Sequence, residues 1–224
     1  MAPLAPGRPA ACLLALLSVV TALSLAAPGL AAGKTGQVTV FWGRNKAEGS
    51  LREACDSGMY TMVTMSFLDV FGAKGKYHLD LSGHDLSAVG ADIKHCQSKG
   101  VPVSLSVGGY GTGYSLPSNR SALDLFDHLW NSYLGGIYEE SDKACNQYGA
   151  WEEAWDRWTA AYPATRFFIG LTADEKSYQW IHPKNVYYGI TPVVQKKDNY
   201  GGVMLWDRYF DKQSDYSSYI KYYA

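Results

Sequence analysis

The sequence predicts an α/β protein in which helices pack on a parallel β-sheet. Two observations support this fold class. Runs rich in β-branched and aromatic residues alternate with segments of helical periodicity. These runs are apolar along most of their length, as expected for parallel strands that are covered on both faces. We expect strands near residues 38–42, 60–67, 101–107, 167–172 and 202–206.

Segments between and after these strands show the periodicity of helices. Ser50 is a suitable N-cap for the first helix, and Gly100 is a suitable C-terminal stop for the second. Gly189 and Pro192 weaken the helical pattern of the segment in which they lie. Residues 71–76 are expected to form a turn, because they include Gly72 and Gly75. The expected helices cover residues 50–57, 84–99, 121–134, 150–161, 186–197 and 216–223.

The stretch Val101–Gly113 combines a strand with an unusual ending. Its apolar run stops at Gly108 and Gly109. This pattern is typical of a buried strand that leads into a loop with backbone angles that favour glycine. An ordinary core strand followed by a glycine turn is the alternative.

The first 31 residues are expected to be a signal peptide rather than part of the fold. Arg8 precedes an apolar run over Ala10–Ala27, and Gly29–Ala31 supplies small residues for cleavage. The remaining domain, 32–224, is then exported, and we find no second run long enough to span a bilayer. Loss of Arg8 changes the formal net charge from −1 to −2. A charge this small does not favour nucleic acid or a membrane surface as a partner.

The cysteines and a glycosylation sequon fit an extracellular protein. Cys12 leaves with the signal peptide, so Cys55, Cys96 and Cys145 remain. Since three is an odd number, two of them can form a disulfide and one is left over. Asn119 begins an Asn-Arg-Ser sequon and is expected to lie in an exposed loop.

Three motifs carry a resemblance to a known family. They are VTVFWGRN at Val38–Asn45, S-x-G-G at Ser106–Gly109, and LWDRYFD at Leu205–Asp211. The chain resembles glycoside hydrolase family 18, in particular the plant class III chitinases and, among them, the plant xylanase inhibitor proteins. The resemblance implies a (β/α)₈ TIM barrel, which normally needs about 250 residues. It also implies that strands 4, 5 and most of strand 6 are missing, between Gly136 and Ile137.

The missing interval is the one in which the family carries its catalytic signature, D-x-x-D-x-D-x-E. Asp124 and Asp127 begin like this signature, but no acid follows in register, and we assign them to the outer face of a helix. Glu139 and Glu140 have no partner aspartates in register. Family 18 enzymes need a glutamic acid to protonate the leaving oxygen. The sequence therefore predicts no catalytic residue in this chain.

Other catalytic arrangements have no support in the sequence. The histidines form no triad and no metal-ligand spacing, and we expect them in loops or on the surface. No cofactor and no metal are therefore predicted. These histidines are His78, His84, His95, His128 and His182.

The resemblance also assigns structural and binding roles. It pairs Cys55 with Cys96 and leaves Cys145 alone, because the relatives' partner of that cysteine lies in the missing interval. It places Trp206 at the floor of a sugar site, with Phe41 and Tyr110 as further candidates. A partner-binding surface is expected on the segment 176–188, although its aromatics could equally pack a helix onto the barrel. Its candidate residues are Lys176, Tyr178, Trp180, His182, Lys184 and Tyr187.

The resemblance favours a secreted, catalytically inactive protein of the xylanase-inhibitor type, which acts in plant defence in the apoplast. The expected partners are fungal or bacterial xylanases, of family 10 rather than family 11, because the relatives' contact loop for family 11 is missing. Chitin oligosaccharides are a further expected ligand, and the chain is expected to be a monomer. An active chitinase, a lectin-like sugar-binding protein and a defective gene product remain as alternatives.

Overall fold

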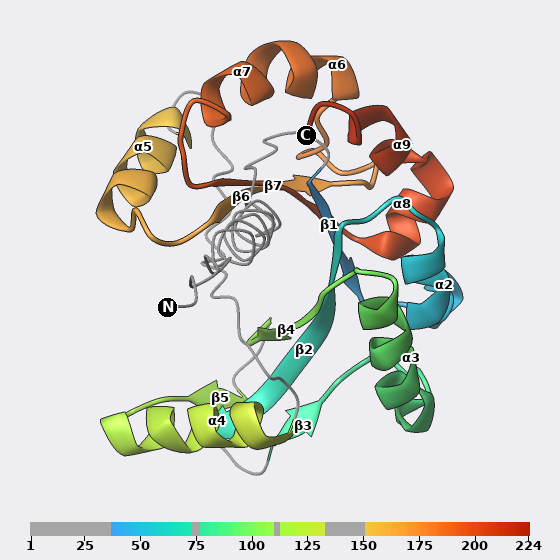
Figure 1. Ribbon diagram of the computed structural model, residues 1–224, viewed down its shortest axis with the longest axis vertical. Helices are drawn as coiled ribbons and strands as arrows, with labels where there is room; N and C mark the ends of the chain where they lie inside the picture. Colours follow the sequence, from blue (N-terminus) through green and yellow to red (C-terminus); the bar gives the residue numbers. More distant parts are fainter. Residues whose placement is uncertain (1–36, 73–76, 110–112, 133–150) are drawn as a thin grey trace, which may run out of the picture. The chain divides into compact units, whose positions relative to one another are not determined.

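The computed structural model describes residues 37–72, 77–109, 113–132 and 151–224, and the side chains of 129–132 are not considered. Residues 34–224 form one compact unit. Its centre is a sheet in which the parallel neighbours run in the order β4, β2, β1, β7 and β6 (Figure 1). The bounds of these strands are β1 Val38–Trp42, β2 Met62–Gly72, β4 Val103–Val107, β6 Phe167–Thr172 and β7 Tyr200–Trp206.

The five expected strands are confirmed, and so is their parallel arrangement. The structure adds two short strands on β2, of which β3 (His78–Leu79) is antiparallel and β5 (Tyr114–Ser115) is parallel to it. β2 continues to Gly72, so the expected turn over 71–76 is wrong for its first two residues. The remaining residues of that turn, 73–76, lie outside the described ranges.

Helices follow the strands as the sequence predicts. The described helices are α2 Leu51–Asp56, α3 Leu86–Ser98, α4 Asn119–Ser132, α5 Trp151–Ala161, α6 Pro183–Asn185, α7 Thr191–Val194, α8 Arg208–Ser214 and α9 Tyr216–Ile220. A 3₁₀ turn, η1 (Lys46–Glu48), precedes α2, and a π-helical segment, η2 (Val186–Ile190), joins α6 to α7. The expected helix over 186–197 is thus present, but it begins earlier and consists of a π-helical segment between two short α-helices.

The expectations missed α8. Asp207, directly after β7, is the N-cap of α8, and its side chain accepts a hydrogen bond from the Phe210 N–H. An Asp directly before Arg-Tyr-Phe-Asp is a helix-start signal that the sequence carries.

The main hydrophobic core lies between the sheet and the helices that follow it. Residues paired in adjacent parallel strands point to the same face, so Val40 shares a face with Val63 and with Leu205. These three side chains are buried together with Leu51 of α2 and Tyr216 of α9. Each buried side chain of this kind contributes about 1.5–3 kcal/mol to folding.

A smaller second cluster packs α5 against the sheet. The Trp155 ring meets Phe167 edge-on with 6.2 Å between centroids and Tyr200 with 6.1 Å. Val194 of α7 is buried with them. This cluster covers the edge of the sheet at which β6 lies.

Glycine is required where β4 ends, as the sequence predicts. Gly108 and Gly109 have φ angles of 116° and 104°, which side chains rarely adopt. A Cβ atom on Gly109 would lie 3.0 Å from the Phe67 ring. The two glycines therefore allow the backbone after β4 to pass close to an aromatic side chain of β2.

Candidate functional site at the carboxyl ends of the strands

The carboxyl ends of the parallel strands bring three aromatic side chains together. Phe41 of β1 lies 5.2 Å from Trp206 of β7, measured between ring centroids. Phe67 of β2 stacks on Trp206 at 5.8 Å and lies 6.5 Å from Phe41. These residues come from strands that are adjacent in the sheet but up to 165 positions apart in the chain, as from Phe41 to Trp206.

Their exposures differ in a way that decides which ring a ligand can reach. Phe41 is only 7% exposed, whereas Trp206 is 36% exposed. A sugar ring can therefore stack on Trp206, while Phe41 supports the indole from the protein side. The third predicted sugar-site residue, Tyr110, lies outside the described residues. Phe67 was not predicted, because no local pattern shows which β2 side chain meets β7.

A cation borders this aromatic cluster. The Arg44 guanidinium lies 5.2 Å from the centre of the Phe67 ring and donates a 3.0 Å hydrogen bond to Asp80. Burial alone would raise the pKa of Asp80. The hydrogen bond from the Ser82 N–H and the charge of Arg44 outweigh it, so that the pKa lies below its usual value.

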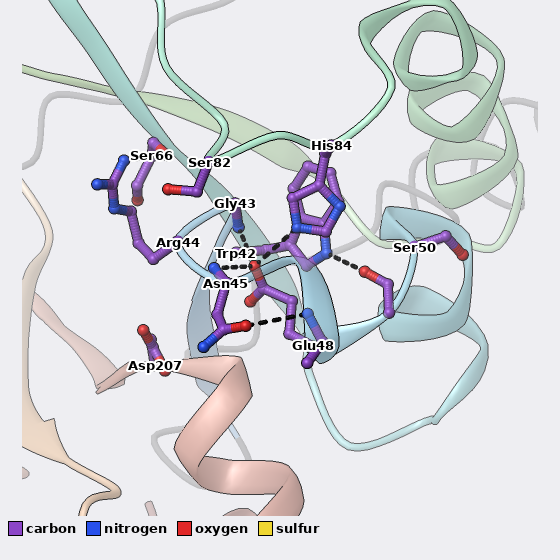
Figure 2. A network of polar contacts seen from close by, with 12 residues as sticks. Trp42, Gly43, Arg44, Asn45, Glu48, Ser50, Ser66, Ser82, His84 and Asp207 are labelled. Atoms are coloured by element: carbon purple, nitrogen blue, oxygen red, sulfur yellow. Dashed lines mark hydrogen bonds and ion pairs between the residues drawn. The ribbon is translucent and has the colours of Figure 1, made fainter.

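Below the strand ends lies a buried carboxylate that the sequence analysis missed, Glu48. Its Oε1 atom accepts hydrogen bonds from the Gly43 N–H at 2.8 Å and the Asn45 N–H at 3.0 Å. A ring nitrogen of His84 lies 3.1 Å from the same atom, as Figure 2 shows. Asn45 and Glu48 form a capping box around η1, and the spacing Asn-x-x-Glu was a signal for it.

His84 was expected in a loop or on the surface, and it does lie in a loop. Its side chain, however, is only 8% exposed, because the imidazole packs on the Trp42 ring with 4.3 Å between centroids. The Glu48 carboxylate is fully buried and lies beside it. This group therefore anchors the loop after β1 to the loop before α3, and it presents no reactive atom to solvent.

Asp207, directly after Trp206, is the other buried carboxyl group at this end of the sheet. Burial raises its pKa to about 6, and the nearby negative charge of Glu48 acts in the same direction. Its cap hydrogen bond to α8 opposes the rise. Because Asp207 is almost completely buried, it cannot approach a glycosidic oxygen as a general acid.

The expected partner segment, 176–188, forms an exposed aromatic and basic surface. Tyr178 is 94% exposed, and Tyr187, Tyr188 and both lysines are also exposed. Trp180 differs, because it is half-buried and meets Tyr216 edge-on at 6.3 Å. Trp180 and the buried Val186 therefore pack the segment onto the domain, while its tyrosines and lysines face solvent.

Part of this segment lines a hollow of about 600 Å³. The opposite wall comes from α8 and α9, which contribute Ser214, Tyr216 and Tyr219, and from the C-terminal Tyr223. None of its lining residues lies on a strand. The hollow is thus built only from the helices and loops of the C-terminal part of the chain.

The structure also places the predicted cysteines, acidic residues and glycosylation sequon. Cys55 of α2 and Cys96 of α3 form a disulfide with a Cα–Cα distance of 5.4 Å, as the resemblance implied. Asp124 and Asp127 are exposed on α4, as expected, and Asp124 accepts a hydrogen bond from the Tyr77 hydroxyl. Asn119 is exposed, as expected, but it is the first residue of α4 rather than part of a loop. Cys145, Glu139 and Glu140 lie outside the described residues.

Neither a metal site nor a membrane span is found within the described ranges. In that part of the chain, no group of three or more His, Cys, Asp or Glu side chains could hold a metal ion. No helix there combines the length and the apolar character needed to cross a membrane.

Comparisons with known proteins show which proteins this chain resembles in sequence and in fold. No family model matches the chain. It is 62% identical to Xylanase inhibitor protein 1 of Triticum aestivum, in an alignment of 305 positions that covers all of both proteins. A solved xylanase-α-amylase inhibitor protein in complex with trehalose matches with a TM-score of 0.72 and 26% identity, over 82% of this chain and 97% of that one. A chitinase from Ipomoea carnea matches with a TM-score of 0.65 and 23% identity, over 83% and 98%.

The alignment with the wheat protein is longer than this chain of 224 residues, so this chain lacks a stretch that the wheat protein contains. The junction predicted between Gly136 and Ile137 lies outside the described residues. The open sheet of parallel strands and the structural matches together give an incomplete (β/α)₈ barrel. By its identity over the full chain and by this fold, the chain belongs to the family of xylanase inhibitor proteins, which have the fold of family 18 chitinases.

Proposed function

We propose that this chain is a secreted, catalytically inactive inhibitor that binds microbial xylanases through the segment 176–188. The observation that carries the proposal is the 62% identity to a wheat xylanase inhibitor over the whole chain. In this proposal the signal peptide at 1–31 directs the domain 32–224 to the apoplast, where it contributes to plant defence.

The surface of the segment suits a protein partner. Interfaces are enriched in tyrosine, tryptophan and arginine, and a few anchoring side chains carry most of their binding energy. Here Tyr178 and Tyr187 are exposed beside Lys176 and Lys184. The neighbouring Trp180 packs against Tyr216, which holds the segment in place before any partner arrives.

The strand ends support inactivity. Glu48 and Asp207 are buried there, and Asp80 is paired with Arg44. The family's general acid belongs to a strand that this chain is predicted to lack. Without a proton donor within about 3 Å of the glycosidic oxygen, the leaving group cannot be protonated. Retained binding without turnover is the expected result.

The proposal is tested by titrating one family 10 and one family 11 xylanase with the secreted protein and measuring residual xylanase activity. We expect inhibition of the family 10 enzyme only. Lys184→Ala should weaken it about tenfold, as removal of one anchoring side chain does. Lys94→Ala, on the exposed side of α3, is the matched control and should have no effect.

The outcomes of that titration test the argument from the missing loop and the proposal itself. Full inhibition of the family 11 enzyme would overturn the argument from the missing loop. Failure of the folded protein to bind either enzyme would contradict the proposal and favour a defective gene product. The same preparation is assayed on chitin oligomers. Turnover that Glu139→Gln or Glu140→Gln abolishes would show that this chain contains a substitute acid.

Binding of chitin oligosaccharides at the strand ends is a second candidate function. It is favoured by the exposed face of Trp206, supported by Phe41 and Phe67. The related inhibitor that was solved with trehalose shows that a protein of similar fold can hold a sugar. Binding of chitohexaose that is lost in Trp206→Ala would support this function.

A further inference from the structure

We propose that the hollow of the C-terminal helices is a second saccharide site, for a neutral oligosaccharide, separate from the strand ends. Five tyrosines contribute to its lining, Tyr187 and Tyr188 on one side and Tyr216, Tyr219 and Tyr223 on the other. Its volume of about 600 Å³ lies in the range of ligand pockets. Tyrosine rings offer flat apolar faces to the C–H faces of a sugar, and their hydroxyls offer hydrogen bonds to its rim.

The wall of the hollow is pre-formed. The Tyr216 hydroxyl donates a 2.6 Å hydrogen bond to the Ile181 carbonyl, and the Tyr223 hydroxyl donates a 2.9 Å bond to the Pro183 carbonyl. These bonds tie α9 and the C-terminal residues to the segment that leads into α6. The Tyr187 ring is held edge-on against Tyr223, 4.9 Å between centroids. A ligand would therefore bind without first ordering these side chains, which reduces the entropic cost of binding.

The polar groups of the hollow identify the class of ligand. Glu175 and Lys184 both line it, and neither forms an ion pair with another described residue. A carboxylate only accepts hydrogen bonds and an ammonium group only donates them. A hydroxyl does both, so a neutral polyhydroxy ligand can satisfy the two groups together. The opposite charges of Glu175 and Lys184 offset each other, so the hollow favours neither an anionic nor a cationic ligand.

Tyr178 and Tyr222, which are exposed but lie outside the hollow, provide a control for the effect of exposure alone. Tyr188 and Tyr219 are 76% and 62% exposed, and both line the hollow. Tyr178 and Tyr222 are even more exposed, at 94% and 80%, but are not part of the lining. If stacking in the hollow drives binding, the pair that lines it matters. If exposed tyrosines bind sugars nonspecifically, both pairs matter equally.

The test is isothermal titration calorimetry of the purified protein with xylohexaose, and with cellohexaose as a second neutral probe that is not a chitin oligomer. We expect Tyr188→Ala and Tyr219→Ala each to weaken binding of at least one probe about tenfold. Tyr178→Ala and Tyr222→Ala should leave it unchanged. Trp206→Ala should also leave it unchanged, which separates this site from the strand ends. Because the ligand is neutral, added salt should change the affinity little.

All of these tyrosines are exposed, so the variants are expected to fold, and circular dichroism checks this. The proposal is overturned if no neutral probe binds. It is also overturned if Tyr178→Ala weakens binding as much as Tyr188→Ala, or if the only signal disappears in Trp206→Ala. The measurement contains no xylanase, so its failure would leave the proposed inhibition intact, and failure of inhibition would leave the saccharide site intact.

Discussion

At the scale of single residues, the buried carboxyl group of Asp207 has the clearest consequence. Burial raises its pKa in the folded protein to about 6, above the value of 3.8 for an exposed Asp. Between these two values the folded state binds more protons than the unfolded state. The free energy of unfolding therefore falls as the pH rises through this window, and the stability contributed at low pH is lost above about pH 6.

Asp207→Asn should remove this pH dependence. Asparagine keeps the oxygen that accepts the hydrogen bond from the Phe210 N–H, so α8 stays capped. Relative to the natural protein, the variant should gain on the order of 2 to 3 kcal/mol of stability between pH 4 and pH 7. Urea unfolding at a series of pH values measures this difference.

The control for that series is Asp85→Asn, at the exposed N-cap of α3. Hydrogen bonds from the Ser87 hydroxyl and N–H lower the pKa of Asp85, so its contribution to stability is lost as the pH falls. The two variants should therefore change the pH dependence in opposite directions. A difference between Asp207→Asn and the natural protein that does not vary with pH would contradict the argument.

At the scale of elements, the Cys55–Cys96 disulfide joins α2 to α3, next to the core. It closes a loop with a sequence separation of 41 residues. In the chain-entropy model, loss of such a bond costs about 4 kcal/mol, because the unfolded chain regains its freedom. We expect Cys55→Ala with Cys96→Ala to lower the free energy of unfolding by about this amount in chemical denaturation.

Cys145→Ala is the matched control for the disulfide variant. The resemblance predicts that Cys145 has no partner in this chain, so its substitution should leave stability unchanged. A large loss of stability in Cys145→Ala, equal to that of the double variant, would overturn the predicted pairing pattern.

The elements also differ in how well local pattern predicts them. β1 and β4 were expected in nearly their observed bounds, because dense β-branched runs bounded by glycine leave few alternatives. The segment Pro183–Val194 was harder, since Gly189 and Pro192 disrupt the usual period and the chain passes through a π-helical turn. Packing of Val186 and Val194 into the two cores holds these turns together.

At the scale of the whole molecule, the open sheet leaves two edges. Among the described elements, β4 and β6 each have a parallel neighbour on one side only. Unpaired edges expose backbone donors and acceptors to other chains. We expect a monomer at low concentration that self-associates as the concentration rises, measured by sedimentation velocity.

A charge on the β4 edge should reduce that association. Val107 ends β4 and is 40% exposed, so Val107→Lys places an ammonium group there with little effect on the core. Leu123→Lys is the control, since Leu123 is exposed on α4 rather than on an edge. Equal association of the natural protein and Val107→Lys would show that this edge is not the contact.

Short patterns in the sequence were enough to predict the α/β class and the five parallel strands, and the family motifs implied the disulfide. The sequence also predicts that the family's catalytic signature is missing. All of these features depend on short patterns and on their order in the chain. The stacking of Phe67 on Trp206 and the burial of Glu48 beside His84 became apparent only in the folded protein. The same holds for Tyr188 and Tyr219, which line one hollow. Each of these contacts joins residues far apart in sequence, and strand register and helix packing set them rather than any local pattern.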